Sequence, residues 1–421
     1  MTTRREFLKA SLATGSLVNW GWTVPGFLSR TAAAAPTANQ PGARDTILVV
    51  VQLSGGNDGL NTVIPHGDDL YAKYRPTLRI PKTQVKKLDD HVGLHPSLEG
   101  LAGLLQDRAL CVVQGVGYPN PSQSHFRSMD IWQAGSTADG VTEGWLGRAL
   151  KGLPAAPSFH LASQNEIAPL ALAGAPTRVP SITSLEDFQL QTSAASGTEV
   201  QAQRRLIETA AHPGQSGPNL LDFVQRTAVN TYASSRRLQE IGKNYQPRAT
   251  YPNTPLGNHL KLAAQLIDAD FGARLFYVSL DGFDTHANQL NTHATLLRQL
   301  SEAVTAFYKD LAARGHQDRL MMMTFSEFGR RTRENGSQGT DHGTAAPMFL
   351  VGGQVRPGLV GEHPSLADLE MGNLKYRLDF RQVYAAILDQ WLGVSSKEVL
   401  GQSFTHAEIF RSDLQKEKHH T

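Results

Sequence analysis

The run LMMMTF (residues 320–325) leads directly into SEFGRR (326–331), and GTDHG (339–343) follows after a short polar loop. The apolar run predicts a buried strand that ends at a carboxylate. A second apolar run at 347–351 predicts the next strand. Acidic and imidazole groups at the ends of adjacent strands are typical of an α/β metallohydrolase. The alternative is a salt-bridged loop between two strands.

Similar apolar runs alternate with amphipathic segments along the rest of the chain. Strands are expected at 46–53, 109–115, 168–172 and 274–280, and helices at 98–105, from about Ser124, and at 256–270, 292–314 and 379–392. This alternation predicts a doubly wound, mostly parallel α/β sheet. The more polar residues 180–250 predict a helical insertion. Residues 35–421 are therefore expected to form one α/β domain with a helical insertion at about 180–250.

The N-terminus has the features of an export signal. Arg4 and Arg5 form a twin-arginine pair, a weakly apolar segment follows at 10–28, and AAAAP occupies 32–36. These features predict a Tat-type signal peptide, residues 1–34, cut after Ala34. The alternative is an uncleaved N-terminal anchor. The Tat reading predicts a periplasmic or secreted protein that meets the Tat translocase during export.

The composition limits the classes of partner that we expect for this chain. The chain has 40 Lys and Arg against 38 Asp and Glu, so its charge suggests neither nucleic acid nor an anionic membrane surface as a partner. No apolar run after residue 40 is long enough to predict a stable membrane span. The single cysteine, Cys111, excludes an intrachain disulfide and lies in an apolar run, which predicts a buried core position.

Polar residues that follow the predicted strands are the candidate metal ligands, because ligands bind at the carboxyl ends of strands in such a sheet. They are Asp58, Asp284, His286, Glu327 and His342. Three carboxylates and two imidazoles suit Zn²⁺ or Mn²⁺, with one or two ions. The alternative for Asp58 is an ordinary turn residue.

Two further residues are candidates for catalysis. Ser124 begins a predicted helix, where a serine is a plausible nucleophile and the amide groups favour a phosphate or sulfate. The alternatives are that Ser122 is the nucleophile, or that Ser124 only caps the helix. His125 fits a packed histidine better than a base. Arg330 is expected to offset charge on a transferring group, with an ion-paired or solvated role as the alternative.

Several motifs in combination resemble a known family over nearly the whole chain. They are the signal peptide, LSGGNDGLN (53–61), SHF (124–126) with MDIW (129–132), FDTHAN (283–288), EFGR (327–330) and DHG (341–343). Together they resemble a family of exported bacterial proteins, the one named for domain of unknown function 1501. The family is grouped with the alkaline phosphatase and sulfatase superfamily. That resemblance implies an alkaline phosphatase-like α/β fold, a two-metal site and a Ser, Thr or formylglycine nucleophile.

The resemblance also implies roles by motif order. Asp58 would match the ligand after the first strand. Ser124, or less well Ser122, falls in the nucleophile region. The middle Asp/His ligand pair would correspond to Asp284 and His286, although the usual spacing is wider.

The last two motifs complete the comparison and include a departure. Glu327 falls where the superfamily has the Asp of its Asp-His pair, and His342 would match the last histidine ligand. Phe328 stands where the superfamily has a metal-binding histidine. This departure leaves open whether the site takes two ions, one or none.

The expected function is therefore an exported metal-dependent hydrolase of phosphate or sulfate esters, acting on a small anionic ester. One alternative is a serine esterase with a Ser-Gly-Asn-His set, which GND (56–58) resembles, but no earlier Gly-Asp-Ser block accompanies it. The other is a non-catalytic binding or assembly protein on a phosphatase-like fold, a role that Phe328 would suit.

Overall fold

A computed structural model describes residues 46–153, 158–163, 166–177, 179–184, 240, 242, 244–270 and 272–412. The predicted signal peptide and most of the predicted helical insertion lie outside these residues. No helix in the described part of the chain has the length and apolar character needed to cross a membrane.

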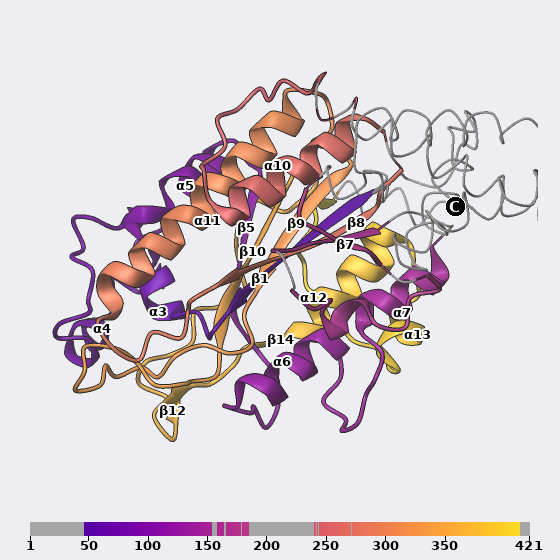
Figure 1. Cartoon of the computed structure of the whole chain (residues 1–421). Helices are drawn as coiled ribbons and strands as arrows, with labels where there is room; N and C mark the ends of the chain where they lie inside the picture. The colour runs from indigo at the N-terminus through magenta and orange to yellow at the C-terminus, as the bar shows by residue number, and fades with distance from the viewer. Residues whose placement is uncertain are drawn as a thin grey trace, which may run out of the picture.

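A mixed, mostly parallel sheet forms the centre of the fold (Figure 1). Its strands follow the order β11 (Gly358–Val360), β5 (Leu110–Gly117), β10 (Ala346–Gly352), β9 (Leu320–Phe325), β1 (Ile47–Ser54), β8 (Leu275–Asp281), β6 (Ser158–Leu161) and β7 (Ser181–Ile182). A short strand, β14 (Leu378–Asp379), also pairs with β5. The predicted α/β class is confirmed.

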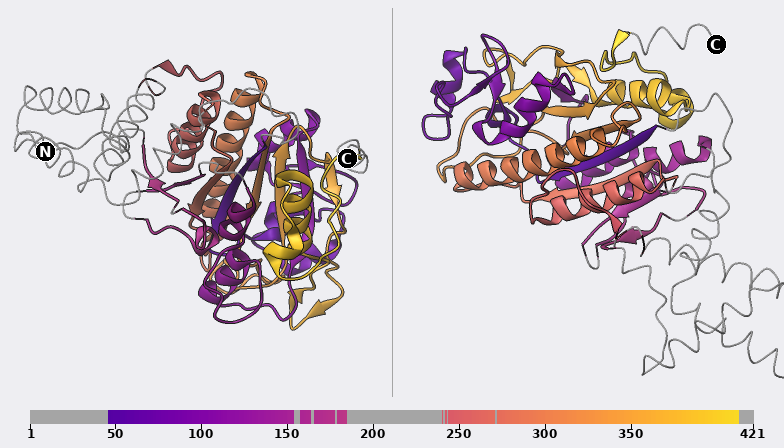
Figure 2. Two further views of the ribbon diagram at one scale, coloured as in Figure 1. Left: turned by 90° about the vertical axis from the view of Figure 1, so that its right-hand side faces the viewer. Right: turned by 90° about the horizontal axis from the view of Figure 1, so that it is seen from above.

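Helices cover both faces of the sheet (Figures 1 and 2). One face carries α5 (Glu99–Gln106), α10 (Pro255–Asp268) and α11 (Gln289–Ala312). The other carries α6 (His125–Ala134), α7 (Trp145–Gly152), α12 (Phe380–Ala386), a π-helical turn (Ile387–Leu392) and α13 (Ser396–Leu400). Successive residues of β1 alternate between the two cores: Ile47 and Val49 pack on the first, Leu48 and Val50 on the second. A continuous apolar strand is what this two-sided burial requires.

Smaller elements connect these layers. They are α3 (Gly59–Thr62), β2 (Val63–Ile64), α4 (Asp69–Tyr74), β3 (Lys86–Lys87), β4 (Gly93–Leu94), the 3₁₀ turns Pro96–Leu98 and Leu170–Leu172, and the hairpin β12 (Leu369–Glu370) with β13 (Asn373–Leu374). The strand predicted at 168–172 is wrong. Pro169 precedes the 3₁₀ turn there and has no N–H to donate to a sheet. The predicted core position of Cys111, which is 0% exposed in β5, is confirmed.

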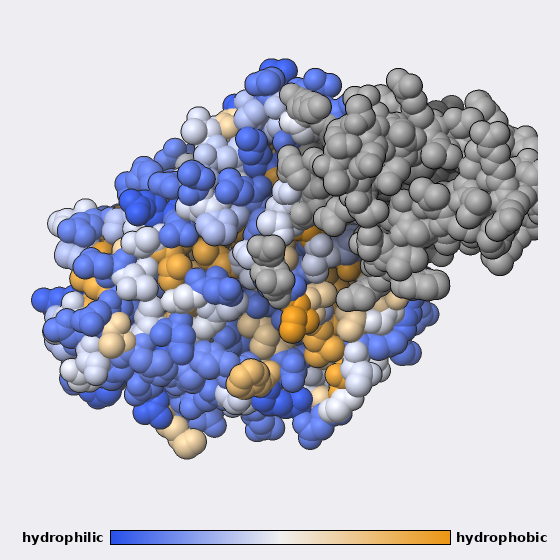
Figure 3. Space-filling model, viewed as in Figure 1, coloured by the Kyte–Doolittle hydropathy of each residue, from blue (hydrophilic) through white to orange (hydrophobic). Residues whose placement is uncertain are grey.

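The direction of β10 explains why one site motif precedes its strand, whereas the others follow theirs. β1 pairs in parallel with β8 and β9, but β10 is antiparallel to both β9 and β5. The start of β10 therefore lies at the sheet edge where β1, β8 and β9 end. As a result, the loop that carries His342 before β10 lies beside the loop that follows β9, where Arg330 and His342 form an isolated antiparallel bridge. Polar side chains predominate in the coloured part of the face drawn in Figure 3, with smaller groups of apolar ones between them.

Candidate metal centre

Three loops meet closely at this edge of the sheet. Gly55 and Gly56 follow β1 with φ angles of 117° and 79°. A Cβ on Gly55 would lie 2.3 Å from the backbone nitrogen of Asp284, and one on Gly56 would lie 2.5 Å from the Phe328 ring. Only glycine fits both the backbone conformation and the contact. The loops after β1, β8 and β9 can therefore pack directly on one another.

A group of metal-ligating side chains lies where these loops meet. His125, Asp284 and His342 each offer one ligand atom, and the three atoms all lie within 4.8 Å of one another. The His125 Nε2 atom is 3.4 Å from Asp284 Oδ2, and the His342 Nε2 atom is 3.1 Å from Asp284 Oδ1. The side chains of Asp284 and His125 are 48% and 34% exposed, so a small solute can reach them.

His286 extends this group. Its Nε2 atom lies 3.1 Å from Asp284 Oδ1 and 2.9 Å from His342 Nε2. A metal with contacts of about 2.0–2.1 Å holds neighbouring ligand atoms roughly 3 to 3.5 Å apart in tetrahedral geometry. The three imidazole nitrogens lie 3.1 to 3.4 Å from the Asp284 carboxylate oxygens, which is in that range, so these donors fit a single ion of the zinc type.

The imidazoles of His125 and His342 are turned so that the other nitrogen of each faces the protein. The Nδ1 atom of His125 lies 2.9 Å from Glu327 Oε1, and that of His342 lies 2.8 Å from the Gln123 carbonyl oxygen. An Nδ1–H that donates to such an acceptor leaves the Nε2 lone pair free for a metal. In both residues this Nε2 atom points to Asp284.

The charge states suit ligands. Burial raises the pKa of Asp284, but contacts led by the hydrogen bond from Arg330 outweigh this effect and lower it to about 2. Burial lowers the pKa of His342. Near neutral pH the carboxylate is therefore ionised and the His342 ring neutral, which are the forms that bind metal.

Asp58, predicted as a ligand, lies in a buried ion pair instead. Arg75 Nη1 donates to Asp58 Oδ2 at 2.6 Å, Nη2 donates to Oδ1 at 3.1 Å, and both side chains are 0% exposed. Gln289 donates to the same carboxylate. This geometry argues against the predicted ligand role, because the lone pairs of Asp58 are directed at a cation that the protein itself supplies.

Arg330, predicted to offset substrate charge, is 1% exposed. Its guanidinium donates to the carbonyl oxygens of Gly55, Gly56, Phe283 and Thr340, and to Asp284 Oδ1 at 2.7 Å. The side chain thus joins the loops and holds Asp284 from behind. A group that contacts substrate would have to face solvent, so the predicted charge-offsetting role does not fit this position.

Glu327 and Phe328 form the floor of the site. Glu327 is 2% exposed and contacts the site through His125. The Phe328 ring is 1% exposed, and its centroid lies 5.0 Å from that of His125 and 4.7 Å from that of His342. Phe328 therefore supports two imidazoles at the position where the resemblance leads one to expect a ligand.

The predicted nucleophile adjoins the cluster. Ser124 is the N-cap residue of α6, its side chain is exposed, and it makes no capping hydrogen bond. The residue before it bonds His342, and the residue after it is His125. The alternative nucleophile, Ser122, accepts a hydrogen bond from the Ser124 N–H at 3.2 Å through its Oγ atom.

The sequence did not single out His125 as a ligand. A histidine at a helix start is equally typical of packing, and only its meeting with Asp284 distinguishes the two roles. The one available signal was its position after the strand β5.

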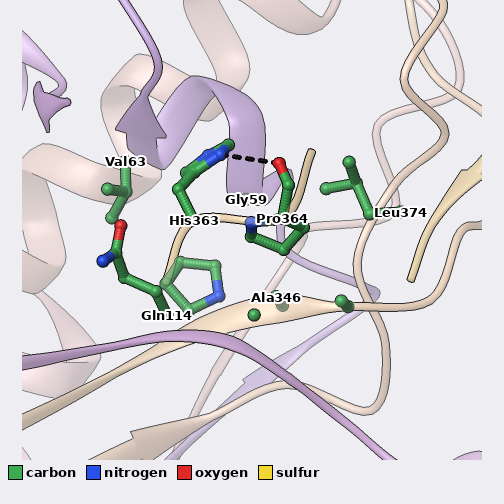
Figure 4. A pocket seen from close by; sticks show the side chains of 10 residues that line it. Gly59, Val63, Gln114, Ala346, His363, Pro364 and Leu374 are labelled. Atoms are coloured by element: carbon green, nitrogen blue, oxygen red, sulfur yellow. Dashed lines mark hydrogen bonds between the residues drawn. The ribbon is translucent and has the colours of Figure 1, made fainter. Parts of the chain in front are cut away.

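The cavity in Figure 4 is a different feature, lined by Gly59, Val63, Gln114, Gly115, Ala345, Ala346, Pro347, His363, Pro364 and Leu374. None of the predicted site residues lines it.

Comparison with solved structures gives distant likenesses. The chain is similar to a lipoteichoic acid synthase from Listeria monocytogenes, with 11% identity, a TM-score of 0.34, and coverage of 92% of this chain and 80% of that chain. It is also similar to a sulfatase from Pseudoalteromonas sp., with 11% identity, a TM-score of 0.37, and coverage of 92% of this chain and 77% of that chain. A third similar structure is alkaline phosphatase from the Antarctic bacterium TAB5, with 12% identity, a TM-score of 0.29, and coverage of 74% of this chain and 92% of that chain.

These TM-scores are too low to inform function. A search of curated proteins finds no match. The model of one family, DUF1501, described as a protein of unknown function, matches residues 45–402. The chain therefore belongs to the DUF1501 family.

Proposed function

We propose that this protein is a metal-dependent hydrolase of phosphate or sulfate esters. The observation that carries the proposal is the convergence of three imidazole Nε2 atoms on the Asp284 carboxylate at the edge of the sheet. Nitrogen and oxygen donors in this combination suit Zn²⁺ or Mn²⁺. The four residues His125, Asp284, His286 and His342 would hold one ion, and the site is open to small anionic esters.

Such an ion, when bound, polarises an ester oxygen and lowers the pKa of a nearby hydroxyl or water. Ser124 is the nucleophile in this proposal. Its hydroxyl is not used to cap α6, and the chain on either side of it contacts the cluster. The position of Asp284 is held by Arg330, whose guanidinium anchors the surrounding loops. The protein thus contributes a fixed set of donors beside a free hydroxyl.

Turnover of a panel of aryl phosphate and sulfate esters, with Zn²⁺ or Mn²⁺ added, tests this proposal. The wild type should hydrolyse at least one ester, His342→Ala should lose both metal and activity, and Ser124→Ala should keep metal but lose turnover. His406→Ala is the matched control, because this histidine bonds Asp389 and Gln390 outside the site. A wild type that binds metal but is inactive on the whole panel would contradict the hydrolase.

One observation favours a second candidate, a non-catalytic binding protein. Phe328 fills the space beneath the cluster, and the Arg330 guanidinium is buried among protein acceptors. Neither is therefore available to stabilise charge on a transferring group. This candidate predicts no turnover on the ester panel and full metal binding in the Ser124→Ala variant.

We also propose Tat-dependent export to the periplasm or medium. The motif at Arg4 and Arg5 and the AAAAP segment at 32–36 support it. Changing both arginines to lysine should leave precursor in the cytoplasm, and the mature wild-type N-terminus should be Ala35. Immunoblotting of cell fractions measures where each protein lies. Normal export of the double variant would remove this assignment.

A further inference from the structure

We infer that Glu327 is a positioning residue, which sets the tautomer of His125, and is not itself a metal ligand. The inference rests on the metal site of the proposed function. It concerns a hydrogen bond that exists with or without an ion, so it can be tested separately.

The carboxylate of Glu327 is occupied by protein groups. Its Oε1 atom accepts the Gly55 N–H at 2.8 Å and lies 2.9 Å from His125 Nδ1. Its Oε2 atom accepts from the Ser326 hydroxyl at 3.1 Å. The side chain is 2% exposed. These contacts hold the carboxylate behind the imidazole, away from the open side of the cluster.

The same residue fixes the start of α6 at two points. Ser128 donates from Oγ to the backbone carbonyl of Glu327 at 2.5 Å, and His125 contacts its side chain. His125 and Ser128 are three residues apart, so they lie on one face of the helix. This double attachment sets both the position of α6 and the rotation of the imidazole.

The tautomer follows from the chemistry of the acceptor. Both Glu327 oxygens already act as acceptors, Oε1 for the Gly55 N–H and Oε2 for the Ser326 hydroxyl, so the imidazole nitrogen that faces Oε1 must carry the hydrogen. In neutral His125 this is Nδ1, and Nε2 then presents its lone pair 3.4 Å from Asp284 Oδ2. Without the carboxylate the proton can move to Nε2, where it would block the metal. Partners of this kind change metal affinity by about 10- to 100-fold when they are removed.

The first test measures the tautomer in metal-free protein. Nitrogen-15 NMR of histidine-labelled protein, with the signal assigned from a His125→Asn variant, should show His125 protonated at Nδ1. In Glu327→Ala the signal should shift toward the Nε2–H form. Glu327→Gln keeps an oxygen acceptor, so it should largely retain the wild-type tautomer. A wild-type His125 protonated at Nε2 overturns the inference even if neither Glu327 variant folds.

The second test measures Zn²⁺ affinity by competition with a chelating dye. Glu327→Ala should weaken binding about 10- to 100-fold, and Glu327→Gln by less. Asp310→Ala removes another buried carboxylate, one that pairs with Arg314 and Tyr245, and should leave affinity unchanged. Equal affinity of Glu327→Ala and wild type overturns the inference. If the expected tautomers occur in a wild type that binds no Zn²⁺, the proposed function fails while the positioning role stands.

Discussion

Asp58→Asn separates a structural carboxylate from a metal ligand. Asp58 and Arg75 are both 0% exposed and share two hydrogen bonds, at 2.6 and 3.1 Å. Arg75 also donates to the carbonyl oxygens of Thr332, at 2.7 Å, and Arg331, at 2.8 Å. The pair thus links the loop after β1 to the loop after β9. We expect the variant to lose stability and to keep its metal affinity.

The size of the loss follows from burial. The substitution leaves the Arg75 guanidinium charged and without its anion, and breaking a buried pair in this way costs about 3–5 kcal/mol. Adding Arg75→Met to Asp58→Asn removes the unpaired charge, and Arg75→Met alone is the other single variant. The double variant should therefore be more stable than the sum of the two single losses predicts, because residues in contact do not behave independently.

Urea denaturation followed by circular dichroism measures the unfolding free energy of all four proteins. The change must appear in the midpoint with an unchanged m value, since a changed m value would report a different unfolded state. Zn²⁺ titration of the folded Asp58→Asn variant completes the experiment. An Asp58→Asn protein of wild-type stability that no longer binds Zn²⁺ would refute the structural role and restore Asp58 as a ligand.

Two further predictions concern the same loops. Burial raises the pKa of Asp58, but Arg75 outweighs this effect and lowers the pKa from its ordinary value of 3.8 to about 2. The ionised form therefore contributes about 2 kcal/mol above pH 4, lost as pH falls toward 2, and acid unfolding of Asp58→Asn should lack this step. Gly56→Ala should destabilise by about 1–3 kcal/mol more than Gly140→Ala in urea unfolding. Both glycines have positive φ, but only at Gly56 would the new Cβ meet the Phe328 ring, whereas nothing lies within 4 Å at Gly140. Equal losses would contradict the steric explanation.

Much of the fold could be predicted because buried strands have a strong local signature. The runs at 46–53, 274–280 and 320–325 are apolar on both faces, and each is a strand of the central sheet. Parallel strands also place the residues that follow them at one edge. The direction of β10 was not predictable, since an apolar run has the same composition in a parallel and an antiparallel ladder.

The site was predicted in part for a related reason. Asp284, His286 and His342 meet because their loops share the sheet edge. Asp58 has the same local setting, yet its carboxylate meets Arg75, and an ion pair between distant residues depends on tertiary packing. His125 was not singled out as a candidate ligand, because a packed histidine and a ligand have the same local sequence. Partner atoms, which sequence does not display, decide both cases.

Metal analysis of the purified full-length protein tests the central claim most directly. Inductively coupled plasma mass spectrometry should find about one Zn²⁺ or Mn²⁺ per chain in the wild type, since the four converging donors suit one ion. The His342→Ala variant should be nearly metal-free, while the His406→Ala control keeps the wild-type content. A folded wild type that contains no metal and takes up neither Zn²⁺ nor Mn²⁺ on dialysis would contradict the account.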